Sequence, residues 1–126
     1  MTIAWIVDDD EEMIGAIQMM LKLLKVESRY FLLARTAVEA LVEEALPDVL
    51  ILDINMPEVT GMDLLEFLRQ HPEWKNLPVI MLSTEAADVQ VDQALAMGAD
   101  AYVTKPVSIE ELEGALKKAF TAHQKK

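Results

Sequence analysis

The sequence of 126 residues contains no cysteine, which excludes disulfide bonds and thiolate metal ligands. No apolar run approaches the ~18 or more residues that a membrane-spanning helix needs. The amino terminus also lacks a basic start followed by a signal-type apolar block. No linker, internal repeat or low-complexity segment interrupts the chain. We therefore expect a single cytoplasmic domain over residues 1–126, without membrane insertion.

Basic residues are scarce, since 11 Lys and Arg stand against 22 Asp and Glu, for a formal net charge of −11. A chain this acidic is repelled by anionic membranes and by the phosphates of nucleic acids, so we expect no direct nucleic-acid binding. The same balance suits a divalent cation or a basic protein partner.

Short apolar stretches alternate with segments of helical periodicity along the whole chain. The stretches at 3–7, 27–33, 49–52, 79–82 and 101–103 are predicted strands. Predicted helices run from Met13 to about Lys25, from about Val38 to Ala45, from Gly61 to about His71, through Val91 to a left-handed cap at Gly98, and from a Ser108 cap with Glu111. This alternation predicts an α/β fold: a doubly wound, five-stranded parallel sheet with five helices.

Polar side chains follow four of these predicted strands at the point where each strand ends. In chain order they are Asp8 and Asp9, then Asp53, then Ser83 and Thr84, and then Lys105. Because the carboxyl ends of parallel strands meet at one edge of the sheet, residues far apart in the sequence should lie together there.

This combination of residues suits phosphoryl-transfer chemistry. Three carboxylates within roughly 4 to 6 Å of one another repel strongly and require a cation. Lys105 supplies one charge, and Mg²⁺, a hard ion that takes oxygen ligands, supplies two. Asp53 could then attack phosphorus and form an acyl phosphate. Lys105 and Mg²⁺ would stabilise the phosphoryl oxygens, and Ser83 would donate a hydrogen bond to one of them.

Each of these residues also has a simpler interpretation. Asp53 could be a turn residue, and the acidic run at 8–12 could complement a helix dipole. Lys105 could be an ordinary surface lysine, and Ser83 and Thr84 could cap a helix. These separate explanations do not account for the coincidence at four strand ends.

Four motifs in this order resemble the receiver domain of two-component response regulators, in particular the single-domain chemotaxis receivers. They are VDD at 7–9, LDINMP at 52–57 with Gly61, LST at 82–84 and YVTKP at 102–106. The resemblance covers Ile3 to about Phe120. It implies the flavodoxin-like strand order 2-1-3-4-5.

The resemblance implies that Asp53 is the phosphoacceptor, receiving its phosphoryl group from a histidine kinase or a phosphotransfer protein. Asp9, Asp53 and the backbone carbonyl of Asn55 would bind Mg²⁺ directly, and Asp8 would bind it through water. Lys105 and Ser83 would assist catalysis. The chain would then be a signalling phosphoprotein that catalyses its own phosphorylation and slow dephosphorylation, rather than an enzyme acting on other substrates.

The output of such a domain would depend on a switch formed by Ser83 and Tyr102. We expect this pair to change a surface that a downstream protein or output domain reads. Three residues are expected to neighbour the phosphate: Thr84, Asn55 and Glu85. The Lys105–Pro106 peptide bond is expected to be cis.

Two positions carry separate expectations. Thr84 stands where the family often has Ala or Gly, so it should crowd the water that hydrolyses the acyl phosphate. His71 and His123 have no paired ligands near them in the sequence, and we expect both at the surface.

Two other function classes stay open. Aspartate-nucleophile phosphatases resemble one another in a second Asp two residues after the nucleophile, and Asn55 at that place cannot supply a titrating proton. A phosphorylation-independent receiver-like interaction module typically loses an acid or the lysine, whereas this chain keeps every such residue.

Overall fold

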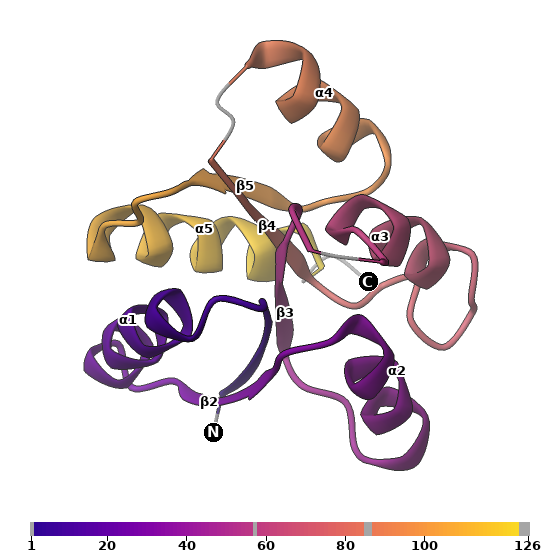
Figure 1. Cartoon of the computed structure of the whole chain (residues 1–126), viewed down its shortest axis with the longest axis horizontal. Helices are drawn as coiled ribbons and strands as arrows, with labels where there is room; N and C mark the ends of the chain where they lie inside the picture. Colours follow the sequence, from indigo (N-terminus) through magenta and orange to yellow (C-terminus); the bar gives the residue numbers. More distant parts are fainter. Residues whose placement is uncertain (1, 57, 85–86, 124–126) are drawn as a thin grey trace.

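Five parallel strands form the centre of the protein, seen here in a computed structural model that describes residues 2–56, 58–84 and 87–123. They are β1 (Ile3–Val7), β2 (Glu27–Phe31), β3 (Val49–Asp53), β4 (Val79–Ser83) and β5 (Ala101–Thr104). Their order in the sheet is β2-β1-β3-β4-β5 (Figure 1). This arrangement confirms the predicted fold and strand order.

Helices cover both faces of the sheet (Figure 1). They are α1 (Glu11–Leu23), α2 (Ala34–Glu43), α3 (Gly61–Arg69), α4 (Asp88–Ala96) and α5 (Ile109–Ala122). Apolar residues of α1 and α5 share one buried cluster, and those of α2, α3 and α4 share the other. Within the described parts of the chain, no helix has the length and apolar character needed to cross a bilayer.

The central strand β3 contributes to both clusters, as its unbroken apolar sequence predicts. Val49 and Ile51 pack toward α1 and α5, whereas Leu50 and Leu52 pack toward α2 and α3. All residues of β3 are buried, Asp53 included. The strand therefore carries an acidic side chain from the core to the edge of the sheet.

Several boundaries differ from the predicted ones: helix α2, expected from about Val38 to Ala45, runs from Ala34 to Glu43, and helix capping accounts for two further differences. Helix α1 begins at Glu11 rather than Met13, since Asp10 is its N-cap and accepts hydrogen bonds from the backbone N–H groups of Glu12 (3.0 Å) and Met13 (3.3 Å). Strand β2 ends at Phe31, two residues before the predicted end, because Leu33 is already the N-cap of α2.

The connections on either side of β5 agree with the predictions. Gly98 has a φ of 107°, in the left-handed region, as expected for a residue that follows a helix. Ser108 and Glu111 form the predicted capping box at the start of α5, each side chain bonded to the backbone N–H of the other residue. Gly98 therefore ends the segment of α4 before β5, and the capping box marks the start of α5 after β5.

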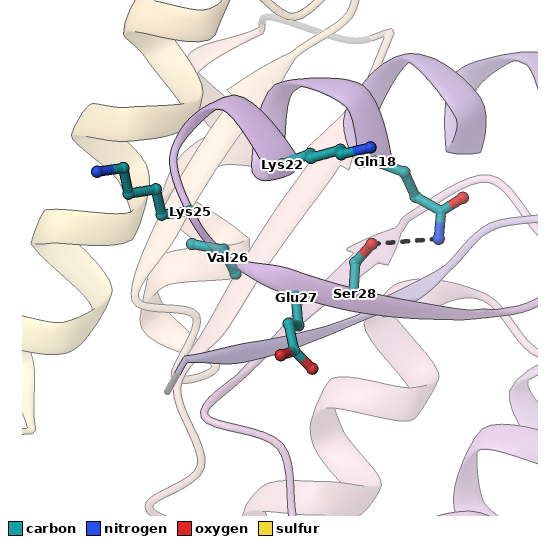
Figure 2. Close-up of a pocket in the computed structure, with 6 residues that line it drawn as sticks. All are labelled: Gln18, Lys22, Lys25, Val26, Glu27 and Ser28. Carbon is teal, nitrogen blue, oxygen red and sulfur yellow. Dashed lines mark hydrogen bonds between the residues drawn. The ribbon is translucent and has the colours of Figure 1, made fainter.

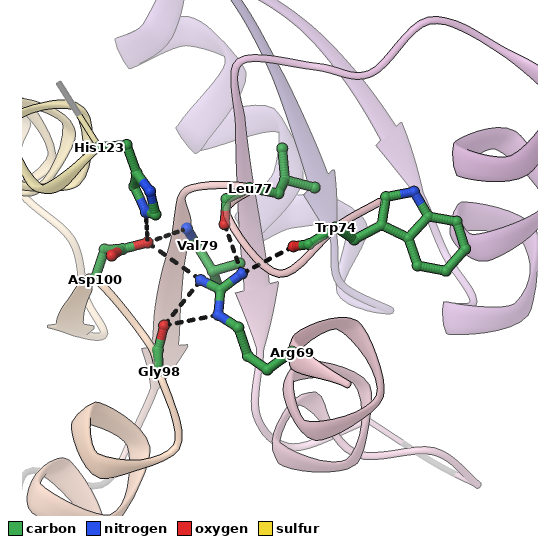
Figure 3. A network of polar contacts seen from close by, with 7 residues as sticks. All are labelled: Arg69, Trp74, Leu77, Val79, Gly98, Asp100 and His123. Carbon is green, nitrogen blue, oxygen red and sulfur yellow. Dashed lines mark hydrogen bonds and ion pairs between the residues drawn. The ribbon is translucent and has the colours of Figure 1, made fainter. Parts of the chain in front are cut away.

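A half-buried arginine, Arg69, joins several segments at the amino-terminal edge of β4 and β5 (Figure 3). Arg69 donates two hydrogen bonds to the Gly98 carbonyl oxygen, from Nε (3.0 Å) and Nη2 (2.8 Å). Its Nη1 donates to the carbonyl oxygens of Trp74 (3.1 Å) and Leu77 (2.8 Å). Burial lowers the pKa of Arg69, an effect that the charge of Asp100 opposes. Arg69 thus satisfies the carbonyl oxygens of Gly98 and Leu77, and it adds a second hydrogen bond to the Trp74 carbonyl oxygen, which also accepts from the Leu77 backbone N–H (3.1 Å).

Asp100 connects this arginine to the end of α5 (Figure 3). Its Oδ2 accepts from the Val79 backbone N–H (2.9 Å) and lies 3.3 Å from Arg69 Nη2 and 3.0 Å from His123 Nε2. The expectation of a surface His123 is therefore wrong, since its side chain is only 19% exposed. The partner, Asp100, lies 23 residues away in the sequence and is brought there by the fold.

His71 is also not a simple surface residue. Its Nδ1 lies 2.8 Å from the Phe67 carbonyl oxygen, and its ring lies 4.3 Å from that of Phe67 and 5.2 Å from that of Trp74. The side chain is half-buried in this aromatic group after α3.

Candidate functional site

The carboxyl ends of β1, β3 and β5 bring two acids and one amine together. Asp8 follows β1, Asp53 is the last residue of β3, and Lys105 follows β5. Lys105 Nζ lies 3.3 Å from Asp8 Oδ2 and 3.2 Å from Asp53 Oδ1. The Asp8 and Asp53 side chains are 0% and 3% exposed, so this is a desolvated charge cluster rather than a surface ion pair.

Asp9 adds a third carboxylate to the cluster. One carboxylate oxygen from each of Asp8, Asp9 and Asp53 lies within 4.8 Å of the others. Asp9 is exposed, which leaves the cluster open to solvent on that side. Asp8 Oδ2 is buried and has no hydrogen-bond partner among the described residues, although it is ion-paired with Lys105. A buried oxygen of this kind, in an oxygen-only donor set, fits a hard divalent cation such as Mg²⁺.

Burial and neighbouring charges have opposing effects on the pKa values of Asp8 and Lys105. Burial raises the pKa of Asp8, the neighbouring charge of Asp53 raises it further, and the backbone N–H of Asp10 and Lys105 oppose the rise. Burial by itself lowers the pKa of Lys105, but attraction to Asp8 and Asp53 outweighs it, so the net pKa is raised. Lys105 therefore stays protonated at neutral pH. Its single charge can balance only one of the three carboxylates when they are ionised.

Backbone N–H groups of the adjoining loops orient the two buried carboxylates. Asp10 donates to Asp8 Oδ1 (2.9 Å), and Asn55 donates to Asp53 Oδ1 (3.2 Å). Because Asp10 is also the N-cap of α1, the acidic run divides between two tasks. Asp8 and Asp9 face the cluster, whereas the later residues of the run belong to the first turn of the helix.

Gly61 supports Asp53 from the start of α3. Its backbone N–H donates to the Ile54 carbonyl oxygen at 3.0 Å. A Cβ built on Gly61 would lie 2.3 Å from the Asp53 carbonyl oxygen and 2.8 Å from Ile54 Cα. Only glycine lets the chain pass this close to the end of β3.

Ser83 and Tyr102 lie on neighbouring strands near the same edge. Ser83 is the buried last residue of β4, and Tyr102 is half-buried in β5. The side chain of Gln90 in α4 connects them, since its Nε2 donates to Ser83 Oγ (3.2 Å) and to Tyr102 Oη (3.1 Å). The sequence analysis missed Gln90, because one glutamine in a weakly periodic helix carries no local signal of such a contact.

The remaining residues of the predicted site fall near this edge or outside the described chain. Thr84 directly follows Ser83 and is exposed, and Asn55 is exposed two residues after Asp53. Glu85 lies outside the described residues. The Lys105–Pro106 peptide bond is cis, as expected, and the Lys105 backbone N–H donates to the Ser83 carbonyl oxygen at 2.8 Å. This bond continues the β4–β5 pairing up to the lysine.

A pocket of about 500 Å³ lies elsewhere, between the end of α1 and the start of β2 (Figure 2). Gln18 Nε2 donates to Ser28 Oγ at 3.1 Å across it, and Lys25 points away from that pair (Figure 2). This pocket adjoins the amino end of β2, whereas the acidic cluster lies at the carboxyl ends of the strands. It therefore takes no part in the chemistry of the cluster.

Comparison with known proteins shows the family of this chain. Residues 4–117 match the family model of the response regulator receiver domain. The chain belongs to this family. Receiver domains are the signal-receiving units of two-component systems, where they interact with histidine kinases and bind Mg²⁺ at an acidic pocket. In this receiver domain the cluster of Asp8, Asp9 and Asp53 has the oxygen donors that such an ion needs.

The relatives of this receiver domain include regulators of transcription. It is 46% identical over 79 residues to the phosphate regulon transcriptional regulatory protein PhoB of Rhizobium meliloti, covering 63% of this chain and 35% of that protein. It is 36% identical over 121 residues to the transcriptional regulatory protein KdpE of Mycobacterium tuberculosis, covering 94% of this chain and 51% of that protein. The chain thus spans about half the length, or less, of these relatives.

A solved structure gives the same fold over nearly the whole chain. The chemotaxis protein CheY4 of Vibrio cholerae superposes with a TM-score of 0.85 at 28% sequence identity. The match covers 94% of this chain and 98% of that protein.

Proposed function

We propose that this receiver domain accepts a phosphoryl group on Asp53 from the phosphohistidine of a histidine kinase or a phosphotransfer protein in the cytoplasm. The observation that carries the proposal is the position of Lys105 Nζ, 3.2 Å from Asp53 Oδ1 and 3.3 Å from Asp8 Oδ2 at a buried strand edge. A lysine held beside two desolvated carboxylates can stabilise an incoming dianionic group as well as the acids themselves.

The transfer begins with attack by an Asp53 carboxylate oxygen on phosphorus. A P–O bond forms as the P–N bond of phosphohistidine breaks, and the departing imidazole nitrogen keeps the electron pair. Lys105 stabilises the charge that develops on the phosphoryl oxygens, and the Ser83 hydroxyl donates to another of these oxygens. The domain thereby assists its own phosphorylation.

Asp8, Asp9, Asp53 and the backbone carbonyl of Asn55 would hold Mg²⁺. When bound, the ion neutralises negative charge on the acids and on the phosphoryl group. The buried Asp8 Oδ2, which has an ion-pair partner in Lys105 but no hydrogen-bond partner among the described residues, and the gathering of three carboxylates around one lysine support this role.

Slow hydrolysis of the acyl phosphate on Asp53 ends the signal. Water attacks phosphorus, the acyl phosphate P–O bond breaks, and the Asp53 carboxylate and inorganic phosphate are the products. Thr84, Asn55 and Glu85 neighbour the phosphate in this proposal, and Thr84 limits the access of the attacking water.

The phosphorylated state is read through Ser83 and Tyr102. Movement of Ser83 toward the phosphoryl group changes the surface formed by α4 and β5, and a downstream protein or output domain binds the changed surface. Residues 1–126 act as one receiver domain in this scheme, and direct contact with nucleic acid is not part of it.

Intact-mass analysis tests the proposal. After incubation with Mg²⁺ and acetyl phosphate, the wild type should gain the mass of one phosphoryl group, and Asp53→Asn should not. Chelation of Mg²⁺ should abolish the gain. If the wild type gains no phosphoryl group under these conditions, the chain instead acts as a phosphorylation-independent interaction module.

A further inference from the structure

Helix α4 is packed lightly against the rest of the protein. Ala94 is its buried residue, whereas Val89 is 76% exposed. Its N-cap, Ala87, makes no side-chain hydrogen bond to the first turn. Few buried apolar contacts, and an N-cap residue without a side-chain hydrogen bond, are features of a segment with low local stability in the part of the chain that the structure describes. Single polar contacts should therefore have a large effect on the position of α4.

Gln90 makes such a contact from the first turn of α4. The two hydrogens of its Nε2 group can be donated separately, one to Ser83 Oγ at 3.2 Å and one to Tyr102 Oη at 3.1 Å. Gln90 is half-buried, as is Tyr102, and Ser83 is fully buried, so water competes little for these hydrogen bonds. One side chain thus joins α4 to the ends of β4 and β5.

We propose that Gln90 is a positioning residue that holds Ser83 and Tyr102 in the unphosphorylated arrangement and ties α4 to them. The inference rests on the proposed function of Asp53. When Ser83 moves toward a phosphoryl group on Asp53, Gln90 can no longer make its hydrogen bonds to Ser83 Oγ and Tyr102 Oη together. Breaking them is part of the free-energy cost of switching, and the released carboxamide frees the first turn of α4.

Thermodynamic linkage predicts how much loss of the Gln90 hydrogen bonds changes the affinity for a ligand that favours the switched arrangement. A ligand that favours the switched arrangement binds more tightly when that arrangement costs less to reach. Net hydrogen-bond contributions imply that loss of the Gln90 bonds strengthens such binding roughly three- to tenfold. Beryllium fluoride with Mg²⁺ is the probe, because it stands in for the phosphoryl group on a carboxylate.

The experiment uses Tyr102 as its own reporter. The chain has two tyrosines, so Tyr30→Phe with 3-fluorotyrosine labelling leaves Tyr102 as the single ¹⁹F signal of the protein, which is followed apart from the fluoride resonances of the probe itself. Gln90→Leu removes both hydrogen-bond donors and keeps a side chain of similar size. Gln93→Leu makes the same chemical change at an exposed position of the same helix and is the matched control. Gln90→Asn, one methylene shorter, serves as a second variant if Gln90→Leu does not fold.

In the Gln90 variant without probe, the ¹⁹F resonance should shift toward its position in the probe-saturated wild type. The variant should also bind beryllium fluoride three- to tenfold more tightly, by the linkage above. The Gln93 control should match the wild type in both respects. Identical spectra and affinities for the Gln90 and Gln93 variants would overturn the inference while leaving the proposed function intact. If the wild type neither responds to the probe nor gains a phosphoryl group on Asp53, the proposed function itself is wrong.

Discussion

Gly61 lies so close to Asp53 that a Cβ on Gly61 would come within 2.3 Å of the Asp53 carbonyl oxygen. The contact is with backbone, which cannot move aside cheaply. We therefore expect Gly61→Ala to displace the end of β3, lowering the free energy of unfolding by about 1 to 3 kcal/mol and slowing phosphorylation of Asp53. Urea denaturation and the rate of phosphoryl gain measure the two effects.

Gly114→Ala is the matched control for this substitution. Gly114 is an exposed residue of α5, and a Cβ there meets nothing within 4 Å. This variant should be more stable than the wild type by about 0.5 to 1 kcal/mol, because alanine favours a helix interior. If Gly61→Ala proved as harmless as Gly114→Ala, the close approach at Asp53 would not constrain the site.

Asp8→Asn should stabilise the protein when metal is chelated. Ionised Asp8 is unfavourable in the fold, since burial raises its pKa above the usual value of 3.8. We expect a gain on the order of 1 kcal/mol at pH 7. Thermal unfolding in EDTA measures it, and adding Mg²⁺ should stabilise the wild type more than the variant. Glu113→Gln, at an exposed position of α5, controls for the loss of one charge.

The pH dependence of that gain follows from the direction of the pKa shift. An acid with a raised folded pKa binds its proton more tightly in the folded state, so the fold loses stability as the pH rises through the shifted range. The advantage of Asp8→Asn should be absent below pH 3.8, grow above it, and become constant beyond the raised folded pKa. An advantage that was already complete at low pH would contradict the assigned cause.

Lys105→Met should destabilise the metal-free protein, because Asp8 and Asp53 would remain buried without their cation. The expected loss is on the order of 3 kcal/mol. Adding Asp8→Asn to Lys105→Met should recover part of it, because the uncompensated charge is then smaller. Urea denaturation of the wild type, both single variants and the double variant forms a thermodynamic cycle. Strict additivity in that cycle would show that Lys105 and Asp8 do not interact.

Arg69→Lys should be costly although the charge is kept. The guanidinium satisfies the carbonyl groups of Gly98, Trp74 and Leu77 at once, and a lysine ammonium cannot reach all of them. We expect a loss of about 2 kcal/mol or more in the free energy of unfolding, with phosphorylation of Asp53 still measurable. Arg35→Lys on the exposed side of α2 should change stability little. Equal effects of the two substitutions would rule out a structural role for the Arg69 contacts.

Thr84→Ala should shorten the lifetime of the acyl phosphate. Thr84 follows Ser83 directly and is exposed at the rim of the site, where it can obstruct the approach of water to phosphorus. Decay of the phosphorylated mass with time, after removal of acetyl phosphate, measures the lifetime. Equal decay rates for the wild type and Thr84→Ala would eliminate this role.

Much of the fold could be predicted because local pattern and long-range packing agree. The apolar run of β3, the cap at Gly98 and the Ser108–Glu111 pair each specify their structure within a few residues. The convergence of Asp8, Asp53 and Lys105 follows from strand direction alone, since parallel strands end on one edge. The acidic run shows the limit, because its division between cluster and helix cap depends on backbone geometry.

Contacts between side chains distant in sequence could not be predicted in this way. His123 pairs with Asp100 only because the end of α5 returns to the start of β5. Gln90 meets Ser83 and Tyr102 only because the fold places the first turn of α4 beside β4 and β5. Neither residue type nor spacing encodes such a meeting, so histidine and glutamine look like ordinary polar residues in the sequence.

The two ends of α4 are held by different means. Just beyond its carboxyl end, the Gly98 carbonyl oxygen accepts two hydrogen bonds from Arg69, the last residue of α3, which also donates to the carbonyl oxygens of Trp74 and Leu77 in the segment leading into β4. In its first turn, the helix is tethered through the carboxamide of Gln90. We therefore expect a displacement of α4 to be smallest near Gly98 and largest at its amino-terminal end, where Val89 lies.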